Sequence, residues 1–160
     1  MEVDLLFQIG DKIFYPMYGA GTVESIEEKE ILGETQFYYI LNMTLRNLQV
    51  MIPTKKASTL VIREVVGNDI LENLLATFHH GQPNVTEDTH KVRQRINIDK
   101  IKSGDIFEGA EVIRDLTYLS KSKKLGMEDK MMLDNARQML ISELVLVKGL
   151  NFDQAARLIN

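Results

Sequence analysis

The chain has 160 residues, of which 44% are hydrophobic, and a formal net charge of -4. It contains no cysteine, which excludes disulfides and thiolate metal sites, and its three histidines are too few for a His-rich metal site. The first residues lack the basic start and apolar run of a signal peptide, and no stretch is apolar for long enough to span a bilayer. These properties predict a cytoplasmic protein of one or two small domains, without a membrane partner.

Residues 1–64 have the pattern of short β-strands separated by glycine and proline corners. The first strand ends at Pro16, because proline has no N–H for a strand ladder. Gly19 and Gly21 then permit a tight return into the second strand. Five such strands predict a small, curled antiparallel barrel of the SH3 or Tudor type, a fold that usually binds partners. The expected strands are Lys12–Tyr15, Gly21–Glu28, Gln36–Met43, Leu48–Ile52 and Thr59–Arg63.

The third of these strands alternates regularly, so its two faces can be assigned. Tyr38 and Ile40 lie on one face. The other face carries Phe37, Tyr39, Leu41 and Met43. Residues 30–34 before this strand are expected to form a hairpin loop, and Pro53 is expected to end the fourth strand.

From Gly67 onward the pattern becomes helical. Capping residues and apolar spacing predict five helical segments. They begin after Asn68 or Asp69, after Thr86 or Thr89, after Ser103 or Asp105, at Met127, and after Asn151. The long fourth segment is expected to stop at Gly149. The predicted fold class is therefore α+β, with a barrel over residues 1–64 and a helical bundle over residues 67–160.

One basic run stands out in this otherwise acidic chain. His90–Lys102 holds five lysines or arginines against one aspartate, a formal charge of +4. Clustered cations suit a phosphate-contacting surface, because binding releases counterions. A solvated helix face explains the same run, and charge by itself modestly favours that simpler explanation.

The sequence carries no enzyme signature. Gly19 and Gly21 precede a strand and lack the lysine of a phosphate-binding loop. His79 and His80 have no carboxylate partner at metal-ligand spacing. We therefore expect no catalytic residue, no metal, no cofactor and no small-molecule substrate.

Three sequence segments are similar to a known family. Ile9–Glu27, which reads IGDKIFYPMYGAGTVESIE, resembles the opening of the CarD family of bacterial transcription regulators. The N-terminal domain of that family is shared with transcription-repair coupling factors. Ser103–Leu116 and Glu128–Leu144 resemble the two characteristic helices of the family. The resemblance covers nearly the whole chain.

This resemblance implies a role in transcription. The barrel would bind the β subunit of RNA polymerase, largely by pairing at a strand edge. The helical domain would contact promoter DNA in the minor groove, at the upstream edge of the melted region, without reading its sequence. Together these contacts would modulate the formation and stability of the open complex. The alternative is a protein–protein adaptor of the transcription or repair machinery that does not bind DNA directly.

The resemblance also assigns residues to the two contacts. The expected polymerase-binding residues are Lys29, Ile31, Met51 and Pro53. The expected DNA-binding residues are His90, Lys91, Arg93, Arg95 and Lys130. Met51 stands where some relatives carry arginine, so an apolar contact would replace a salt bridge. His90 stands where well-studied relatives carry a tryptophan that wedges beside a base pair, and this chain has no tryptophan.

Overall fold

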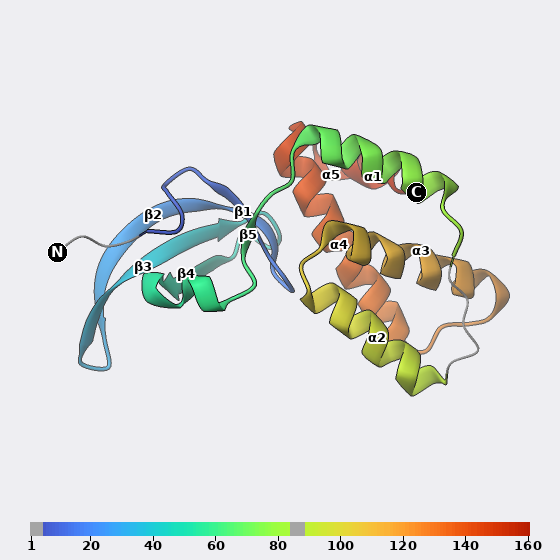
Figure 1. The fold of residues 1–160 in the computed structure, drawn as a ribbon, viewed down its shortest axis with the longest axis horizontal. Coiled ribbons are helices and arrows are strands. Elements are labelled where there is room, and N and C mark those ends of the chain that lie inside the picture. Colours follow the sequence, from blue (N-terminus) through green and yellow to red (C-terminus); the bar gives the residue numbers. More distant parts are fainter. Residues whose placement is uncertain (1–4, 84–88) are drawn as a thin grey trace.

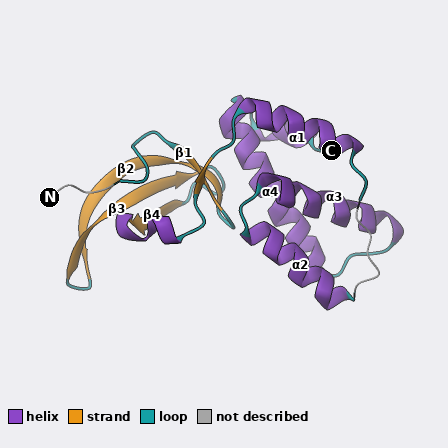
Figure 2. Cartoon of the chain, viewed as in Figure 1, coloured by secondary structure: helices purple, strands orange, loops and turns teal. Residues whose placement is uncertain are grey.

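The computed structural model describes residues 5–83 and 89–160, in which a β-sheet is followed by helices (Figures 1 and 2). The strands are β1 (Lys12–Tyr15), β2 (Gly19–Ile31), β3 (Glu34–Met43), β4 (Gln49–Pro53) and β5 (Arg63–Glu64), with a 3-10 helix at Thr54–Thr59. The helices are α1 (Asn68–His80), α2 (His90–Lys102), α3 (Ile106–Ser122), α4 (Met127–Lys148) and α5 (Phe152–Leu158). The predicted α+β class is confirmed. None of the helices described is long and apolar enough to cross a membrane.

The sheet is antiparallel throughout, in the order β4-β3-β2-β1-β5. Figure 1 shows the long β2–β3 hairpin curling away from the helices. On its core face, Tyr39 and Leu41 are almost fully buried, and the Tyr39 hydroxyl accepts a hydrogen bond of 3.0 Å from the backbone N–H of Phe7. The curled sheet and the two faces predicted for β3 are therefore confirmed.

Two predictions in this half of the chain were wrong. The fifth strand does not begin at Thr59, which instead ends the 3-10 helix, where its hydroxyl donates to the Lys56 carbonyl at 2.7 Å. The hairpin loop is also shorter than residues 30–34. Ile31 pairs with Glu34, so only Leu32 and Gly33 form the turn, both with positive φ. Such a two-residue turn matches the twist of the strands, which lets pairing continue almost to the tip.

The predicted helix ends are largely confirmed. Thr89 caps α2, Asp105 caps α3, and Asn151 caps α5 in a reciprocal capping box. Helix α4 ends at Gly149, whose backbone is left-handed. Thr86 lies outside the described residues. The prediction for α1 was wrong: Gly67 is the N-cap, and the Asn68 side chain instead accepts a 2.9 Å bond from Lys148.

The helical core extends into the sheet. Leu71, Ile113 and Leu144 are completely buried in it. Phe14 of β1 and Ala20 of β2 pack into the same cluster of buried side chains. Three residues, 65–67, join the sheet half to the helical half, because β5 ends at Glu64 and α1 begins at Asn68.

Candidate protein and nucleic-acid interfaces

The structure brings the four sheet residues with an expected polymerase contact onto one face. Met51 is paired with Ile40, and Pro53 with Tyr38, across β3 and β4. Lys29 and Ile31 lie on β2 in register with the same face, since Glu27 is opposite Tyr38. Because alternate residues of a strand share a face, the whole set lies opposite the buried Tyr39 side. The set is Lys29, Ile31, Met51 and Pro53.

This face adjoins an open strand edge. Strand β4 is the last in the order of the described strands, so its outer backbone groups can pair with an added strand. Met51 is 42% exposed and Ile31 38% exposed, so both offer apolar contacts to a partner. Pro53, which lacks an N–H, closes the edge at one end. The arrangement suits a partner that adds a strand beside β4.

The amino-terminal end of α2 holds a compact polar cluster. Nη2 of Arg93 lies 2.9 Å from Nδ1 of His90 and 3.3 Å from Oδ2 of Asp129, on α4. The other ring nitrogen of His90 lies 2.9 Å from the Gln94 side chain. Asp129 is almost completely buried, whereas the His90 side chain is 53% exposed. Arg93 therefore neutralises a buried carboxylate and also holds the imidazole of an accessible histidine.

This geometry changes the part expected of Arg93. Its side chain is only 20% exposed and points inward, on the same helix face as the buried Asn97 and Ile101. No apolar pattern in the sequence marks that face, because two of its three residues, Arg93 and Asn97, are polar. Lys91 and Arg95, by contrast, are exposed on the outer side of α2 and are free to face a phosphate.

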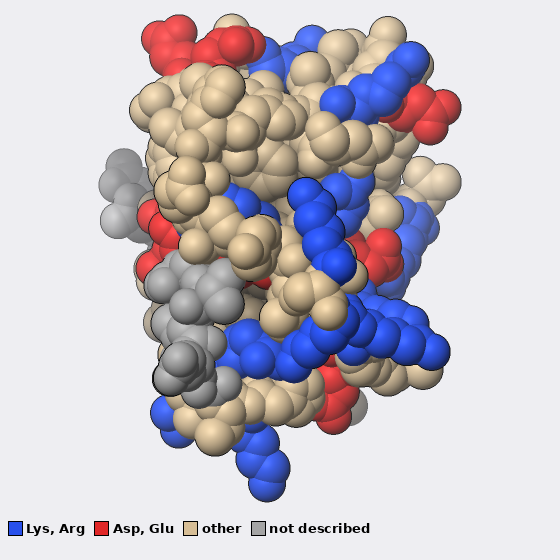
Figure 3. Space-filling model, turned by 90° about the vertical axis from the view of Figure 1, so that its right-hand side faces the viewer, with Lys and Arg blue, Asp and Glu red and all other residues tan. Residues whose placement is uncertain are grey.

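Further cations surround this end of the helical half. The end of α3, the connector to α4 and the first turn of α4 come together near the start of α2, since Asp129 of α4 contacts His90. Figure 3 shows Lys and Arg side chains gathered across the lower part of this end of the molecule. The exposed members outside α2 are Lys121, Lys123, Lys124 and Lys130. Together with Lys91 and Arg95 they form what we call the cationic end; of the acids described among them, Glu128 is exposed.

Three members of the cationic end were missed by the expectations drawn from the sequence. Lys121, Lys123 and Lys124 form a short basic run of their own. In the sequence this run predicts only a basic connector before the long fourth helix. Its position beside the start of α2 depends on the antiparallel packing of α2, α3 and α4, which no local pattern specifies.

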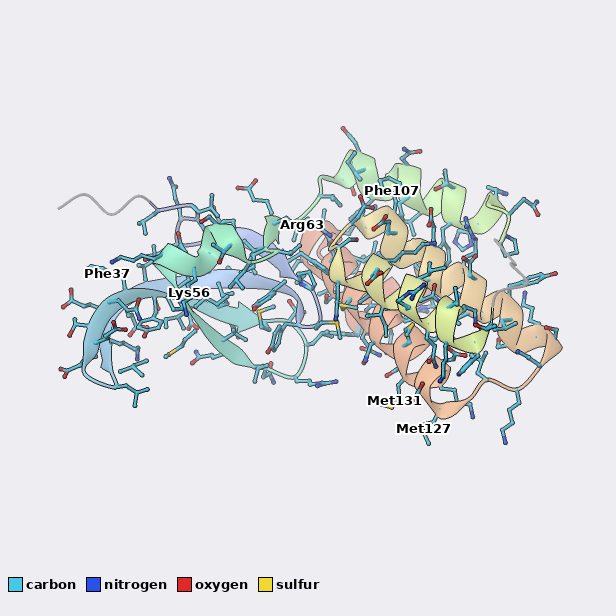
Figure 4. The ribbon with its side chains drawn as sticks, turned by 60° about the horizontal axis from the view of Figure 1, so that its bottom comes forward. Phe37, Lys56, Arg63, Phe107, Met127 and Met131 are labelled. Carbon is cyan, nitrogen blue, oxygen red and sulfur yellow. The ribbon has the colours of Figure 1, made fainter. Side chains whose placement is uncertain are left out.

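An apolar groove lies between α2 and α4. It measures about 420 Å³ and is lined by Ile98, Met131 and Met132, with Met17 of the β1–β2 corner at one side. Met131 is 58% exposed, and Figure 4 shows it projecting beside Met127 from the helical half. In residues 5–83 and 89–160, no group of three or more His, Cys, Asp or Glu is placed to hold a metal ion.

Comparison with known proteins matches both halves of the chain. Residues 7–66 match the family model described as CarD-like/TRCF RID domain, and residues 73–160 match the model described as CarD, C-terminal domain. YdeB of Bacillus subtilis, provisionally described as a transcription factor, is 49% identical over 149 residues, which are 93% of this chain and 97% of YdeB. A solved structure, CdnLNt from Myxococcus xanthus, is 33% identical with a TM-score of 0.33 and covers 41% of this chain and 93% of its own.

Proposed function

We propose that this chain, which belongs to the CarD family of transcription regulators, binds RNA polymerase through its sheet and promoter DNA through its helices. The two contacts together modulate how readily the open complex forms and how long it persists. The role requires neither a cofactor nor a catalytic step, and it belongs in the cytoplasm, where transcription takes place in bacteria.

The sheet half is proposed to bind the β subunit of the polymerase. A strand of the partner pairs with the free edge of β4, so backbone hydrogen bonds supply affinity. Met51 and Ile31 add apolar contacts beside that edge, and Lys29 adds one positive charge. The shared face of these residues supports this proposal, because a single partner surface can reach all of them.

The helical half is proposed to contact DNA near the upstream edge of the melted region. The cationic end faces phosphates through Lys91, Arg95 and Lys130, a contact that carries no sequence information. His90 lies at the start of α2 with half of its side chain exposed, where its ring can rest in the minor groove. Arg93 supports this ring and makes no phosphate contact of its own.

One observation carries the proposal: the two candidate surfaces lie at opposite ends of the molecule. In Figure 1 the β2–β3 hairpin extends away from the helices, while the start of α2 and the end of α3 lie at the far side. One chain can therefore hold a polymerase lobe and a DNA duplex at the same time, with no overlap between them.

The proposal is tested with the full-length chain and a purified polymerase. Binding to an isolated β-subunit lobe is measured in solution, and the decay of open complexes is followed after a competitor is added. We expect saturable binding to the lobe and a change in the rate of decay that saturates with it. Binding to the lobe without any change in decay would contradict the proposed role in the open complex.

A protein–protein adaptor remains the second candidate function, and the apolar groove between α2 and α4 favours it. Methionine-lined grooves adapt well to apolar segments of other proteins. The two candidates differ in the binding of naked DNA. An adaptor leaves duplex DNA unbound at low salt, whereas the proposed regulator binds unrelated duplexes with similar affinity.

A further inference from the structure

The sheet and the helices are joined by a buried ion pair. The Arg63 guanidinium donates two parallel hydrogen bonds, of 2.7 and 2.8 Å, to the carboxylate of Glu143 on α4. Glu143 is completely buried, and Arg63 is about one-quarter exposed. Figure 4 shows Arg63 between the sheet and the helices. Paired bonds of this kind fix the relative orientation of both groups, because both side chains are planar.

Arg63 and Glu143 each hold additional partners at this place. Nε of Arg63 donates to the Gly104 carbonyl at 2.7 Å, in the turn between α2 and α3, and its guanidinium carbon lies 4.4 Å from the centre of the Phe14 ring. Glu143 also accepts the backbone N–H of Val66 at 2.9 Å. The pair therefore links β1, β5, the segment between the halves, the α2–α3 turn and α4.

A stripe along α4 provides further links to the sheet. The backbone N–H groups of Met17 and Ala20 donate to the Met139 sulfur at 3.3 Å and to the Ser142 hydroxyl at 2.9 Å. The Lys12 ammonium donates to the Leu146 carbonyl at 3.2 Å. Residues 139, 142, 143 and 146 follow helical spacing, so one face of the C-terminal part of α4 lies against the sheet.

The backbones approach closely at this junction. A β-carbon on Gly19, whose φ is +87°, would lie 2.8 Å from the hydroxyl oxygen of Ser142. Phe14 and Ala20 are buried in the core of the helices, although they belong to the sheet. Sliding or rotation of one half on the other would therefore expose apolar surface and break several hydrogen bonds at once.

We propose that the two halves form one rigid body and that Arg63 and Glu143 are the positioning pair that sets their relative orientation. The consequence for transcription depends on the function proposed above. A rigid junction holds the cationic end at a set distance and angle from the sheet face with Met51. Two weak contacts then strengthen each other, because binding at one surface raises the effective concentration of the other surface at its binding site.

Rigidity can be measured without any partner. The chain has no cysteine, so Ser58→Cys and Ser120→Cys give two exposed sites for spin labels, one after β4 and one on α3. We expect one narrow distribution of distances between the labels. Glu143→Leu, which removes both bonds to Arg63 at similar side-chain volume, should lose that single narrow peak. A broad distribution in the parent protein, or an unchanged narrow one in Glu143→Leu, would overturn the proposal.

The matched control is Glu111→Leu. Glu111 pairs with Lys100 at 3.0 Å, but both residues belong to the helical half, so the narrow peak should persist. Each variant is first checked for a cooperative thermal transition. If Glu143→Leu does not fold, Arg63→Lys replaces it, because lysine keeps the charge but not the two parallel bonds.

The functional readout separates positioning from folding. Glu143→Leu should bind the isolated lobe and naked DNA as the parent does, while its effect on open-complex lifetime falls by at least about tenfold. An unchanged effect on lifetime would show that orientation does not matter. If the parent itself binds neither lobe nor DNA, the proposed function fails, while the label distances still decide whether the junction is rigid.

Discussion

At the scale of single residues, position on a helix separates arginines that look alike in the sequence. Arg93 and Arg95 are two positions apart, so they face different sides of α2. Arg93 turns inward to the buried Asp129, and Arg95 turns outward to solvent. Asp129 in turn needs its cation, because an unpaired carboxylate in a protein interior is costly. The same charge therefore stabilises the fold at one position and remains available for a ligand at the other.

Arg93→Ala is expected to lower the free energy of unfolding by about 2–3 kcal/mol, because it leaves Asp129 buried without its closest cation. Arg95→Ala should change stability by less than about 0.5 kcal/mol. Urea denaturation of both variants measures the difference. Equal losses of stability would mean that Arg93 does not neutralise Asp129.

His90→Trp is expected to lengthen the lifetime of the open complex, because an indole covers more base surface than an imidazole and stacking contributes about 1–3 kcal/mol per base. His90→Ala should shorten that lifetime only slightly. Both are measured by decay after addition of a competitor, at a promoter that forms unstable complexes. A complete loss of effect in His90→Ala with no change in His90→Trp would indicate a specific imidazole contact instead of a wedge.

At the scale of elements, β4 combines a free edge with an exposed apolar side chain. Natural proteins protect such edges, and here Pro53 ends the strand after five residues. The flanking surface is mixed, since Lys29 and Glu27 lie on the same face of β2. A short, partly protected edge of this kind favours a specific partner strand over aggregation.

Met51→Glu is expected to weaken binding to the polymerase lobe by about tenfold or more, because it would bury an unpaired charge beside the added strand. The control is Ile9→Glu, which places the same charge on an exposed residue of the loop before β1. Titration of the lobe with each full-length variant gives the two affinities. Comparable weakening by both substitutions would argue against contact at the β4 edge.

Across the molecule as a whole, positive and negative side chains are distributed unevenly, although the net charge is small. The chain carries -4 overall, yet the cationic end gathers lysines and arginines from α2, α3, α4 and their connector. Among the described residues, acids far from this end include Glu27, Glu28 and Glu30 of β2. Such a separation directs the cationic end toward a polyanion, while the opposite end is repelled by it.

DNA binding by the full chain is therefore expected to be weak, indifferent to sequence and sensitive to salt. Three or four phosphate contacts give a slope of about -3 for log K against log salt concentration. Lys124→Ala should reduce the magnitude of that slope by about 1, whereas Lys55→Ala in the sheet half should leave it unchanged. A flat salt dependence, or a strong preference among unrelated duplexes, would show that the cationic end is not the DNA surface.

The sequence alone determined what depends on neighbours within a few residues. Alternation placed Tyr39, Leu41 and Met43 on one face of β3, because strand period is local. Capping is local too, so the sequence identified Asn151 and narrowed two other helix starts to a pair of candidates each, Thr86 or Thr89 and Ser103 or Asp105. Characteristic segments such as Ile9–Glu27 were enough to indicate the family. The predictions at Thr59 and Asn68 were wrong because each side chain forms a different hydrogen bond from the expected one. The Thr59 hydroxyl donates to the Lys56 carbonyl, and the Asn68 side chain accepts from Lys148.

Which distant residues meet depends on how the elements pack in three dimensions. The tertiary structure paired Arg93 with Asp129 and Arg63 with Glu143, and it brought Lys121, Lys123 and Lys124 beside the start of α2. No periodic pattern specifies such contacts, because they depend on how α2, α3 and α4 pack and on how the sheet rests against α4. A charged residue becomes a buried partner or a free cation through that packing, since only packing removes it from water.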